Sequence, residues 1–222
     1  MIVIGLTGSI AMGKSTIGSM MKNINIPVHE SDHVVHELLK RESVARPAIE
    51  ASFPLSEYPQ IYDKKTKELK RKEFGDLIFQ NDDNKEILES ILHPLVQKSQ
   101  NEFIRAETLK GREIVCLDIP LLFETDAQKR VDYTIVVSAP YFIQRERALS
   151  RPNMNEEKFN AIIEKQMPDK EKCARADYII KTGIGHAPAL KSLKIALEDM
   201  RIKSGHISDP FKDETSKENV TK

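Results

Sequence analysis

This 222-residue chain has no excess of either charge, since 34 lysines and arginines balance 34 aspartates and glutamates. A net charge of zero provides no bulk attraction to nucleic acid or to an acidic membrane, and we expect neither as a partner. Any anion-binding site must therefore be formed locally, by a few residues. The length allows one sizeable domain, or one domain that carries an inserted subdomain.

Cysteine is also scarce, and long hydrophobic runs and internal repeats are missing. Cys116 and Cys173 are too few for a disulfide framework, and Cys116 lies in an apolar run where a buried thiol is expected. A reducing, cytoplasmic location fits this composition. No stretch approaches the length of a membrane-spanning helix. The apolar start leads directly into a glycine-rich segment, so we expect a structural strand there and not a signal peptide.

The glycine-rich segment is the most informative part of the sequence. From Gly8 to Ser15 it reads Gly-x4-Gly-Lys-Ser, the pattern of a phosphate-binding loop. In such a loop, backbone N–H groups and the N-terminus of the next helix face a polyphosphate, and glycines allow the close approach. Lys14 is then expected to reach the β- and γ-phosphates, and Ser15 to offer its hydroxyl to Mg²⁺.

The residues on either side of the loop strengthen this interpretation. Residues 1–6 form an apolar, β-branched run typical of a buried parallel strand, and apolar residues recur at helical spacing over 15–21. The alternative is a glycine turn between a strand and a helix with no ligand. Such a turn has no use for Lys14 and Ser15 together, so we favour nucleotide binding.

Further apolar runs predict the rest of the fold. Strands are expected at 24–28, 113–119, 133–138 and 176–180. Because helical patterns separate them, we predict an α/β fold, with a three-layer parallel sheet of about five strands and helices on both faces. Helices are expected at 31–40, 71–80, 83–92 and 94–109, where Pro94 begins a new helix, and 53–67 reads as a loop.

These elements suggest a domain organisation. The core is expected to comprise 1–30, 111–139 and 177–203, and it ends in an amphipathic helix that carries Leu190, Leu193, Leu197 and Met200. Residues 31–110 are predicted to form a helical insertion able to close over a substrate, and 140–176 a second helical hairpin. Residues 204–222 are polar and aperiodic, so we expect a disordered tail.

Two carboxylates are candidates for chemistry. Asp118 is the last residue of a predicted apolar strand. In many phosphate-loop sites an aspartate at this position supports Mg²⁺, either directly or through a water molecule. Many strands end in aspartate, however, so this pattern alone is weak. Asp32 follows the second predicted strand, at the sheet edge where ligands bind, and it could accept a proton from a hydroxyl. Spacing leaves open the alternative that Ser31 or Asp32 caps the following helix.

Basic residues and histidines give weaker signals. Arg147 and Arg151 are four apart on a predicted helix face and could offset charge on a transferring phosphoryl group. The pattern alone favours a solvated basic face. His29, His33 and His36 are bunched, but no metal-ligand pattern accompanies them, so we interpret them as surface or supporting residues.

Several short segments together resemble the dephospho-coenzyme A kinase family, over residues 2 to about 182. They are Gly5-Leu-Thr-Gly8 through Thr16, Glu30-Ser-Asp32, Leu69-Lys-Arg71, Leu92-His-Pro-Leu95, Asp118-Ile-Pro-Leu-Leu-Phe-Glu124, Gln144 through Arg151, Gln166-Met-Pro168 and Ala176-Asp177. The Leu-His-Pro-Leu and Pro-Leu-Leu-Phe-Glu segments are far more specific than the phosphate loop.

The resemblance implies a phosphate-loop kinase built like the nucleoside monophosphate kinases, with an ATP-binding core, a coenzyme A-binding domain at 31–110 and a lid at 140–176. It implies that ATP, with Mg²⁺, phosphorylates the ribose 3′-hydroxyl of dephospho-coenzyme A, the last step of coenzyme A synthesis. The family's catalytic aspartate falls on Asp32, its substrate residues on Arg71 and His93, and its lid arginines on Arg147 and Arg151. Its ATP loop corresponds to Ala11, Met12, Gly13, Lys14, Ser15 and Thr16, with Gly8 before it.

The chain departs from the family pattern at two places. In the loop, Ser9, Ala11 and Met12 replace two glycines and a serine. Further along, Glu30 replaces the first acid of the family's Asp-x-Asp motif. Two other functions remain as alternatives. One is another small-molecule or nucleotide kinase of the same fold, and the other is a nucleotide-dependent switch. No Asn-Lys-x-Asp or Thr-Lys-x-Asp run favours a guanine-binding switch.

Overall fold

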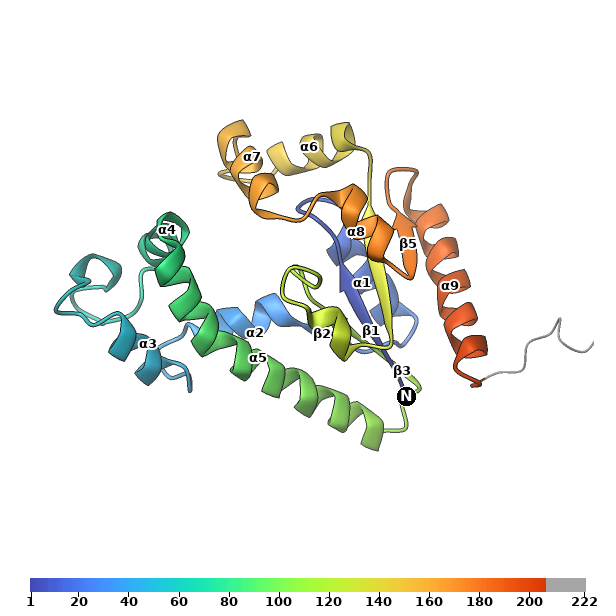
Figure 1. Ribbon diagram of the computed structural model, residues 1–222, viewed down its shortest axis with the longest axis horizontal. Helices are drawn as coiled ribbons and strands as arrows, with labels where there is room; N and C mark the ends of the chain where they lie inside the picture. The colour runs from blue at the N-terminus through green and yellow to red at the C-terminus, as the bar shows by residue number, and fades with distance from the viewer. Residues whose placement is uncertain (207–222) are drawn as a thin grey trace, which may run out of the picture. The chain divides into compact units, whose positions relative to one another are not determined.

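The computed structural model describes residues 1–206, so most of the tail expected at 204–222 lies outside the described residues. The chain divides into two compact units (Figure 1). The first consists of Met1–Val28 together with the chain from Gly111 onward, and the second is His29–Lys110. Each unit has its own hydrophobic core.

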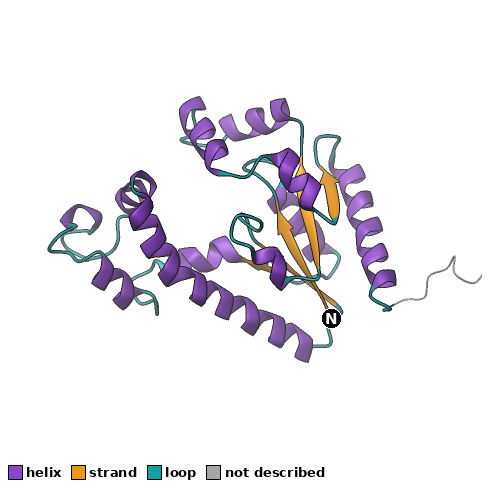
Figure 2. Cartoon of the chain, viewed as in Figure 1, coloured by secondary structure: helices purple, strands orange, loops and turns teal. Residues whose placement is uncertain are grey.

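A parallel sheet forms the centre of the first unit (Figure 2). Its strands are β1 (Ile2–Thr7), β2 (Val28–Glu30), β3 (Ile114–Asp118), β4 (Tyr133–Ser138) and β5 (Tyr178–Lys181). The chain passes from the first unit into the second within β2. Their order is β2-β3-β1-β4-β5, and β1 pairs in parallel with both β3 and β4. The predicted fold class is confirmed. Leu6 lies opposite Asp118 in this register, so the carboxyl ends of β1 and β3 are adjacent.

Helices cover both faces of this sheet. They are α1 (Lys14–Asn23), α6 (Tyr141–Leu149), α7 (Glu156–Lys165), α8 (Asp169–Arg175) and α9 (His186–Lys203). Helices α1 and α9 share a core on one face, to which Ile4, Ile17 and Leu197 contribute, and α8 packs against β4 on the other (Figure 1). The amphipathic pattern predicted for the last helix is confirmed, because Leu193, Leu197 and Met200 are buried while Leu190 packs at the edge of this core.

The second unit is helical and includes α2 (Ser31–Leu38), α3 (Arg46–Ser52), α4 (Arg71–Gln80), α5 (Asp82–Leu109) and a short 3-10 helix (Pro59–Ile61). Phe53 lies at its centre, with its ring edge-on to Tyr58 at 5.7 Å and to Phe74 at 5.4 Å between centroids. The Tyr62 hydroxyl donates to the Phe53 carbonyl at 2.6 Å. This unit therefore has an aromatic core separate from that of the sheet.

The prediction that Pro94 begins a new helix is wrong. Helix α5 continues from Asp82 to Leu109 with Pro94 inside it. A proline within a helix costs about 3 kcal/mol or more, because one backbone hydrogen bond is lost and its ring crowds the preceding turn. Here Ile91, Leu92 and Leu95 lie on both sides of Pro94 and all pack into the core of the second unit, which offsets that cost.

Other boundaries also differ from expectation. Helix α3 lies in a segment for which no helix was predicted, although Pro47 in its first turn was a usable start signal. Strand β2 begins at Val28 and not at residue 24, because Asn25 turns the chain with a φ of 63°. Strand β5 is shifted toward Lys181. The hairpin expected at 140–176 consists of three helices, α6, α7 and α8.

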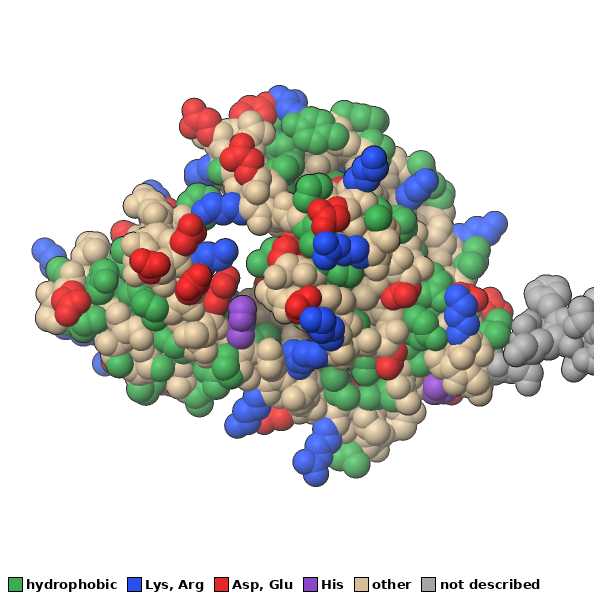
Figure 3. Space-filling model, viewed as in Figure 1, with side chains coloured by type: hydrophobic (Ala, Val, Ile, Leu, Met, Phe, Trp, Pro, Cys, Tyr) green, Lys and Arg blue, Asp and Glu red, His purple; other side chains and the backbone are tan. Residues whose placement is uncertain are grey.

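The distribution of charged side chains on the surface agrees with the balanced charge of the sequence. Lysine and arginine side chains are interspersed with aspartate and glutamate side chains on the face shown in Figure 3. Among the described residues, no helix has the combination of length and apolar character needed to cross a membrane.

Candidate active site

The loop between β1 and α1 has the shape that its glycines predict. Gly13 adopts a φ of 94°, which side-chain-bearing residues rarely adopt. A Cβ on Gly8 would lie 2.7 Å from the Val137 carbonyl oxygen, so only glycine fits there. Ala11 has a φ of 60°, and its side chain is buried with Ala148 and Phe159. The loop therefore closes tightly at both ends, although an alanine, Ala11, and not a glycine adopts a left-handed conformation within it.

Two glutamines hold the loop at Ile10. Gln144 of α6 donates its amide Nε2 to the Ile10 carbonyl at 2.9 Å, and the Ile10 N–H donates to Gln166 Oε1 at 3.0 Å. Both polar backbone groups of one loop residue are thus bonded to side chains from the 140–176 segment. We call Gln144 and Gln166 the glutamine clamp.

Arg147 takes part in a second contact with the loop. Its guanidinium donates to the Thr182 hydroxyl and to the Thr182 carbonyl, each at 3.0 Å. The same hydroxyl donates to the Met12 carbonyl at 2.6 Å. The interpretation of Arg147 as part of a solvated basic face is therefore wrong. Arg147 and Arg151 also do not share a helical face, because α6 ends at Leu149 and Arg151 is exposed in the bend beyond it.

Lys14 and Asp118 form an ion pair, so the structure brings together the predicted phosphate-binding lysine and the predicted metal-supporting aspartate. Their side chains are only 16% and 11% exposed. The pairing follows from topology, because Lys14 opens α1 just after β1 while Asp118 ends the adjacent strand β3. In so poorly hydrated a place, a fixed cation interacts more strongly with a phosphate than it would in bulk water.

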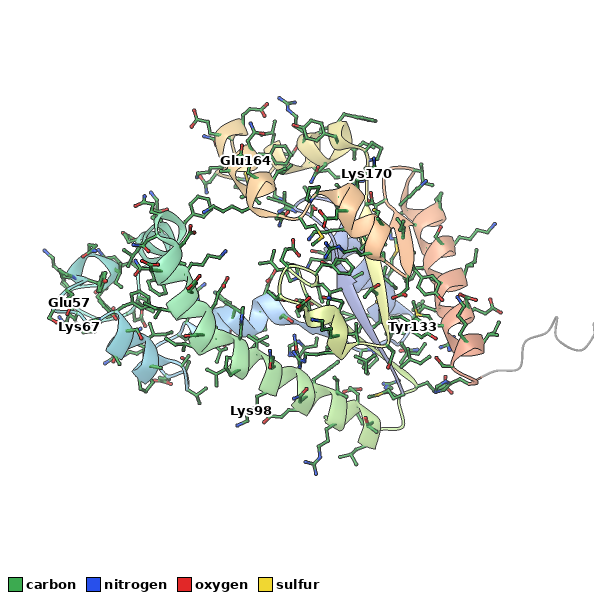
Figure 4. All side chains as sticks on the ribbon, viewed as in Figure 1. Glu57, Lys67, Lys98, Tyr133, Glu164 and Lys170 are labelled. Carbon is green, nitrogen blue, oxygen red and sulfur yellow. The ribbon has the colours of Figure 1, made fainter. Side chains whose placement is uncertain are left out.

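A buried ion pair supports this end of the sheet. On α8, Lys170 is exposed (Figure 4), whereas Lys172 is fully buried and pairs with Glu124 at 2.8 Å. Glu124 also accepts the Met167 N–H at 3.0 Å, directly after Gln166 of the glutamine clamp. Lys172 additionally donates to the Pro120 carbonyl, two residues after Asp118. These contacts join the segment that follows Asp118 to the segment that holds the loop.

Sequence reasoning assigned no role to five residues of this network: Glu124, Gln144, Gln166, Lys172 and Thr182. Signals existed for Glu124, Gln144 and Gln166, which lie in the segments that carry the family resemblance. No local pattern marked Lys172, since a lysine on a short polar helix is usually solvated. Thr182 is recognisable only through its contacts across the fold.

Burial alters two ionisable groups near these elements. The pKa of the Cys116 thiol is raised strongly, first by burial and then by the nearby Asp118 carboxylate, so this cysteine is inert at neutral pH. In the second unit, burial lowers the pKa of His29 below its ordinary value. His29 Nε2 lies 3.0 Å from the Ser99 hydroxyl.

The second unit carries the other predicted site residues. Asp32 is exposed in the first turn of α2, whose N-cap is Glu30 and makes no side-chain cap bond. The Ser31 hydroxyl accepts from Gln100 Nε2 at 2.9 Å instead. The alternative in which Ser31 or Asp32 caps this helix is therefore wrong, and Asp32 keeps an exposed carboxylate.

Arg71 and His93 lie on two further helices of this unit. Arg71 opens α4 and, together with Lys40 and Arg41, lines a surface pocket of about 480 Å³. His93 is exposed on α5 next to Pro94. Glu42 and Glu68 also line this pocket, so its three cationic side chains outnumber its carboxylates by only one.

The donor atoms beside Lys14 suit a magnesium ion. Ser15 offers a hydroxyl and Asp118 a carboxylate, and Mg²⁺ prefers such oxygen ligands. Ser15 is the residue after Lys14, and Asp118 contacts Lys14 directly. Ser15 and Thr16 are exposed at the start of α1, so a ligand can reach their hydroxyl groups.

The chain thus combines a tight phosphate loop, a lysine–aspartate pair at the sheet edge and a separate helical unit. A family model described as dephospho-CoA kinase matches residues 2–186. The chain belongs to the dephospho-CoA kinase family. The resemblance inferred from the sequence is thereby confirmed, and the chain is a kinase, an enzyme that transfers a phosphoryl group to a hydroxyl.

Individual dephospho-CoA kinases match over most of their length. The dephospho-CoA kinase of Agrobacterium fabrum is 45% identical over 200 residues, which cover 90% of this chain and 98% of the relative. That of Bartonella quintana is 49% identical over 181 residues, covering 82% and 89%. The solved dephospho-CoA kinase from Campylobacter jejuni has a TM-score of 0.64 at 26% identity and covers 92% of this chain and 98% of its own.

Proposed function

We propose that this chain transfers the γ-phosphoryl group of ATP to the ribose 3′-hydroxyl of dephospho-coenzyme A, giving coenzyme A and ADP. Membership in the dephospho-CoA kinase family over residues 2–186 is the observation that carries this proposal. The paired Lys14 and Asp118 beside the loop support it independently, because a phosphoryl-transfer site needs a fixed cation and oxygen ligands at the phosphates.

The loop and Lys14 bind the phosphates of ATP in this proposal. Backbone N–H groups of residues 11–16 and the start of α1 face the β-phosphate, and Lys14 leaves Asp118 to contact the β- and γ-phosphates. Ser15 and Asp118 would hold Mg²⁺, Asp118 directly or through water. When bound, the ion offsets charge on the phosphates. The glutamine clamp and Thr182 keep the loop in its binding shape before ATP arrives, which reduces the ordering cost of binding.

Asp32 is proposed to orient the 3′-hydroxyl and to accept its proton as the oxygen attacks the γ-phosphorus. Arg71 and His93 are proposed to bind dephospho-coenzyme A. Arg71, which lines the pocket with Lys40 and Arg41, would contact the phosphates of this substrate. Arg147 and Arg151 are proposed to act from the 140–176 lid. Arg151 is exposed beyond α6 and would contact the phosphates of ATP. Arg147 also holds the Met12 end of the loop through Thr182.

The reaction is proposed to take place in the cytoplasm. Cys116 and Cys173 are both free, as expected of a protein in a reducing compartment.

One assay tests the proposed reaction against its alternatives. The protein is incubated with Mg²⁺, ATP and dephospho-coenzyme A, and coenzyme A and ADP are quantified by chromatography; we expect equal amounts. ADP without coenzyme A would instead indicate an ATPase or a nucleotide-dependent switch. Turnover with a nucleoside monophosphate or another small alcohol, but not with dephospho-coenzyme A, would indicate a different kinase of this fold.

A further inference from the structure

Helix α2 presents three potential metal ligands on one face. His33, His36 and Glu37 each offer one ligand atom, and all three atoms lie within 4.8 Å of one another. Their spacing of three and four residues makes His33 a neighbour of both others on the helix surface. Both histidines are exposed and Glu37 is partly exposed, so an ion can approach from solvent. We propose that these residues bind a divalent transition-metal ion such as Zn²⁺.

The donor set selects this class of ion. Two imidazole nitrogens and one carboxylate oxygen suit zinc, whereas Mg²⁺ and Ca²⁺ take oxygen ligands. Neighbouring ligands on a tetrahedral zinc ion lie about 3.3 Å apart for bonds of about 2.0 Å. His36 Nδ1 is 3.7 Å from Glu37 Oε1, so small side-chain rotations at an exposed surface bring the ligands into range.

Lys40 prepares the carboxylate for this role. Its ammonium group donates to Glu37 Oε2 at 2.6 Å, which leaves Oε1 on the side of His36. A hydrogen bond to the second oxygen of a ligating carboxylate fixes its orientation, as outer partners do in many metal sites. Three protein ligands would leave one coordination position for water.

Metal binding here has a consequence for catalysis, and this part rests on the role proposed above for Asp32. His36 follows Asp32 by four residues, so their Cβ atoms are about 5–6 Å apart on the same side of the helix. A divalent cation held by His33 and His36 is a strong local charge beside Asp32, and it draws the Asp32 carboxylate away from the substrate hydroxyl. Zinc bound at His33, His36 and Glu37 therefore inhibits phosphoryl transfer.

Calorimetric titration with Zn²⁺, on protein without an affinity tag and without ATP, tests the site itself. We expect one zinc ion per chain. His33→Ala, His36→Ala and Glu37→Gln should each weaken binding by at least about tenfold, since even outer-shell changes cost 10–100-fold. His206→Ala removes another exposed histidine and should leave the affinity unchanged. Alanine favours helices, so α2 should survive, and the melting temperature checks this.

Saturable one-to-one binding that needs all three residues supports the site. Absence of such binding by the wild-type protein would overturn it, as would an unchanged affinity in any of the three variants. A loss of affinity in His206→Ala as large as in His33→Ala would also contradict the assignment.

A second experiment tests inhibition. Coenzyme A formation is followed while a chelator buffer fixes the free zinc concentration, because ATP itself binds zinc. With an excess of a zinc-selective chelator that leaves Mg²⁺ free, wild type and the His33→Ala/His36→Ala double variant should turn over equally. At the zinc level that saturates the wild type, only the wild type should slow. Equal inhibition of both proteins, or zinc binding without inhibition, would overturn the link to Asp32. Absence of coenzyme A from both proteins under chelation would instead contradict the proposed function.

Discussion

At the scale of single residues, Lys14 has two partners in turn, Asp118 in the free protein and the phosphates of ATP in the proposed complex. Lys14→Ala should lower kcat/KM by about 100-fold or more, because the charge that stabilises the transferring phosphoryl group is lost. The fold should persist, since other contacts hold the loop. Steady-state kinetics and circular dichroism check this. Near-normal coenzyme A formation by a folded Lys14→Ala protein would refute the phosphate-loop assignment.

Asp32 can be tested without disturbing its surroundings, because it is exposed and does not cap α2. Asp32→Asn keeps the shape of the side chain but removes the proton acceptor, so kcat should fall by about 100-fold or more. ATP affinity and melting temperature should change little. A stable, ATP-binding and fully active variant would contradict the role of Asp32 while leaving the kinase assignment intact.

At the scale of elements, the glutamine clamp makes an asymmetric prediction. Gln144 acts as a donor to Ile10 and Gln166 as an acceptor from it. Gln144→Glu should therefore weaken ATP binding several-fold, because a carboxylate cannot donate to a carbonyl, while Gln166→Glu keeps its acceptor and should weaken binding less. Both changes add the same charge, so the difference in ATP affinity isolates the hydrogen bond.

Gln97→Ala, on the exposed surface of α5, is a control that should leave ATP affinity unchanged. Equal losses in the two glutamate variants would show that charge alone explains them. The hydrogen-bonding roles of Gln144 and Gln166 would then be wrong.

Strand β2 makes a prediction about pH through His29, the residue just before Glu30. Burial lowers the pKa of His29 below 6.5 in the folded protein, so below pH 6.5 the unfolded chain binds the proton more readily. Stability contributed by neutral His29 is present above about pH 6.5 and is lost as the pH falls toward the folded value. The melting temperature should decline over this range. His29→Gln should flatten the decline, whereas His206→Gln should not.

The elements also show where sequence reasoning succeeds. Strands β1, β3 and β4 were found because each is an apolar run buried in a parallel sheet. Helix α5 was divided wrongly because a start signal at Pro94 was weighed without the tertiary packing that overrides it. A short sequence signal indicates only the local conformational preference, and tertiary packing can override that preference.

The candidate site shows the same division. Gly8, Gly13, Lys14 and Ser15 were identified from a contiguous motif. The contact of Lys14 with Asp118 was not predicted, because it depends on the pairing of β1 with β3. The local pattern around Arg147 favoured a solvated face because its partner Thr182 lies 35 residues further along the chain. Contacts made across the fold by side chains with ordinary local surroundings, such as Lys172, leave no periodic trace in a single sequence.

At the scale of the whole molecule, residues 29–110 form a continuous unit with its own core of Phe53, Phe74 and Leu92. We expect this segment, expressed alone, to be helical by circular dichroism and to unfold cooperatively. Phe53→Ala should abolish that transition or lower its midpoint sharply, because truncating a buried phenylalanine costs about 3–5 kcal/mol. A segment without cooperative unfolding would show that its core depends on the rest of the chain.

The position of β1 also governs the order of events during synthesis. β1 is made first, yet its neighbours β3 and β4 begin at Ile114 and Tyr133, after the entire second unit. At ribosomal rates of about 5–20 residues per second, β1 stays unpaired for several seconds or longer while residues 29–110 emerge and can fold. The phosphate loop therefore acquires its shape late, after the helical unit, and nascent chains too short to include β4 should not retain ATP.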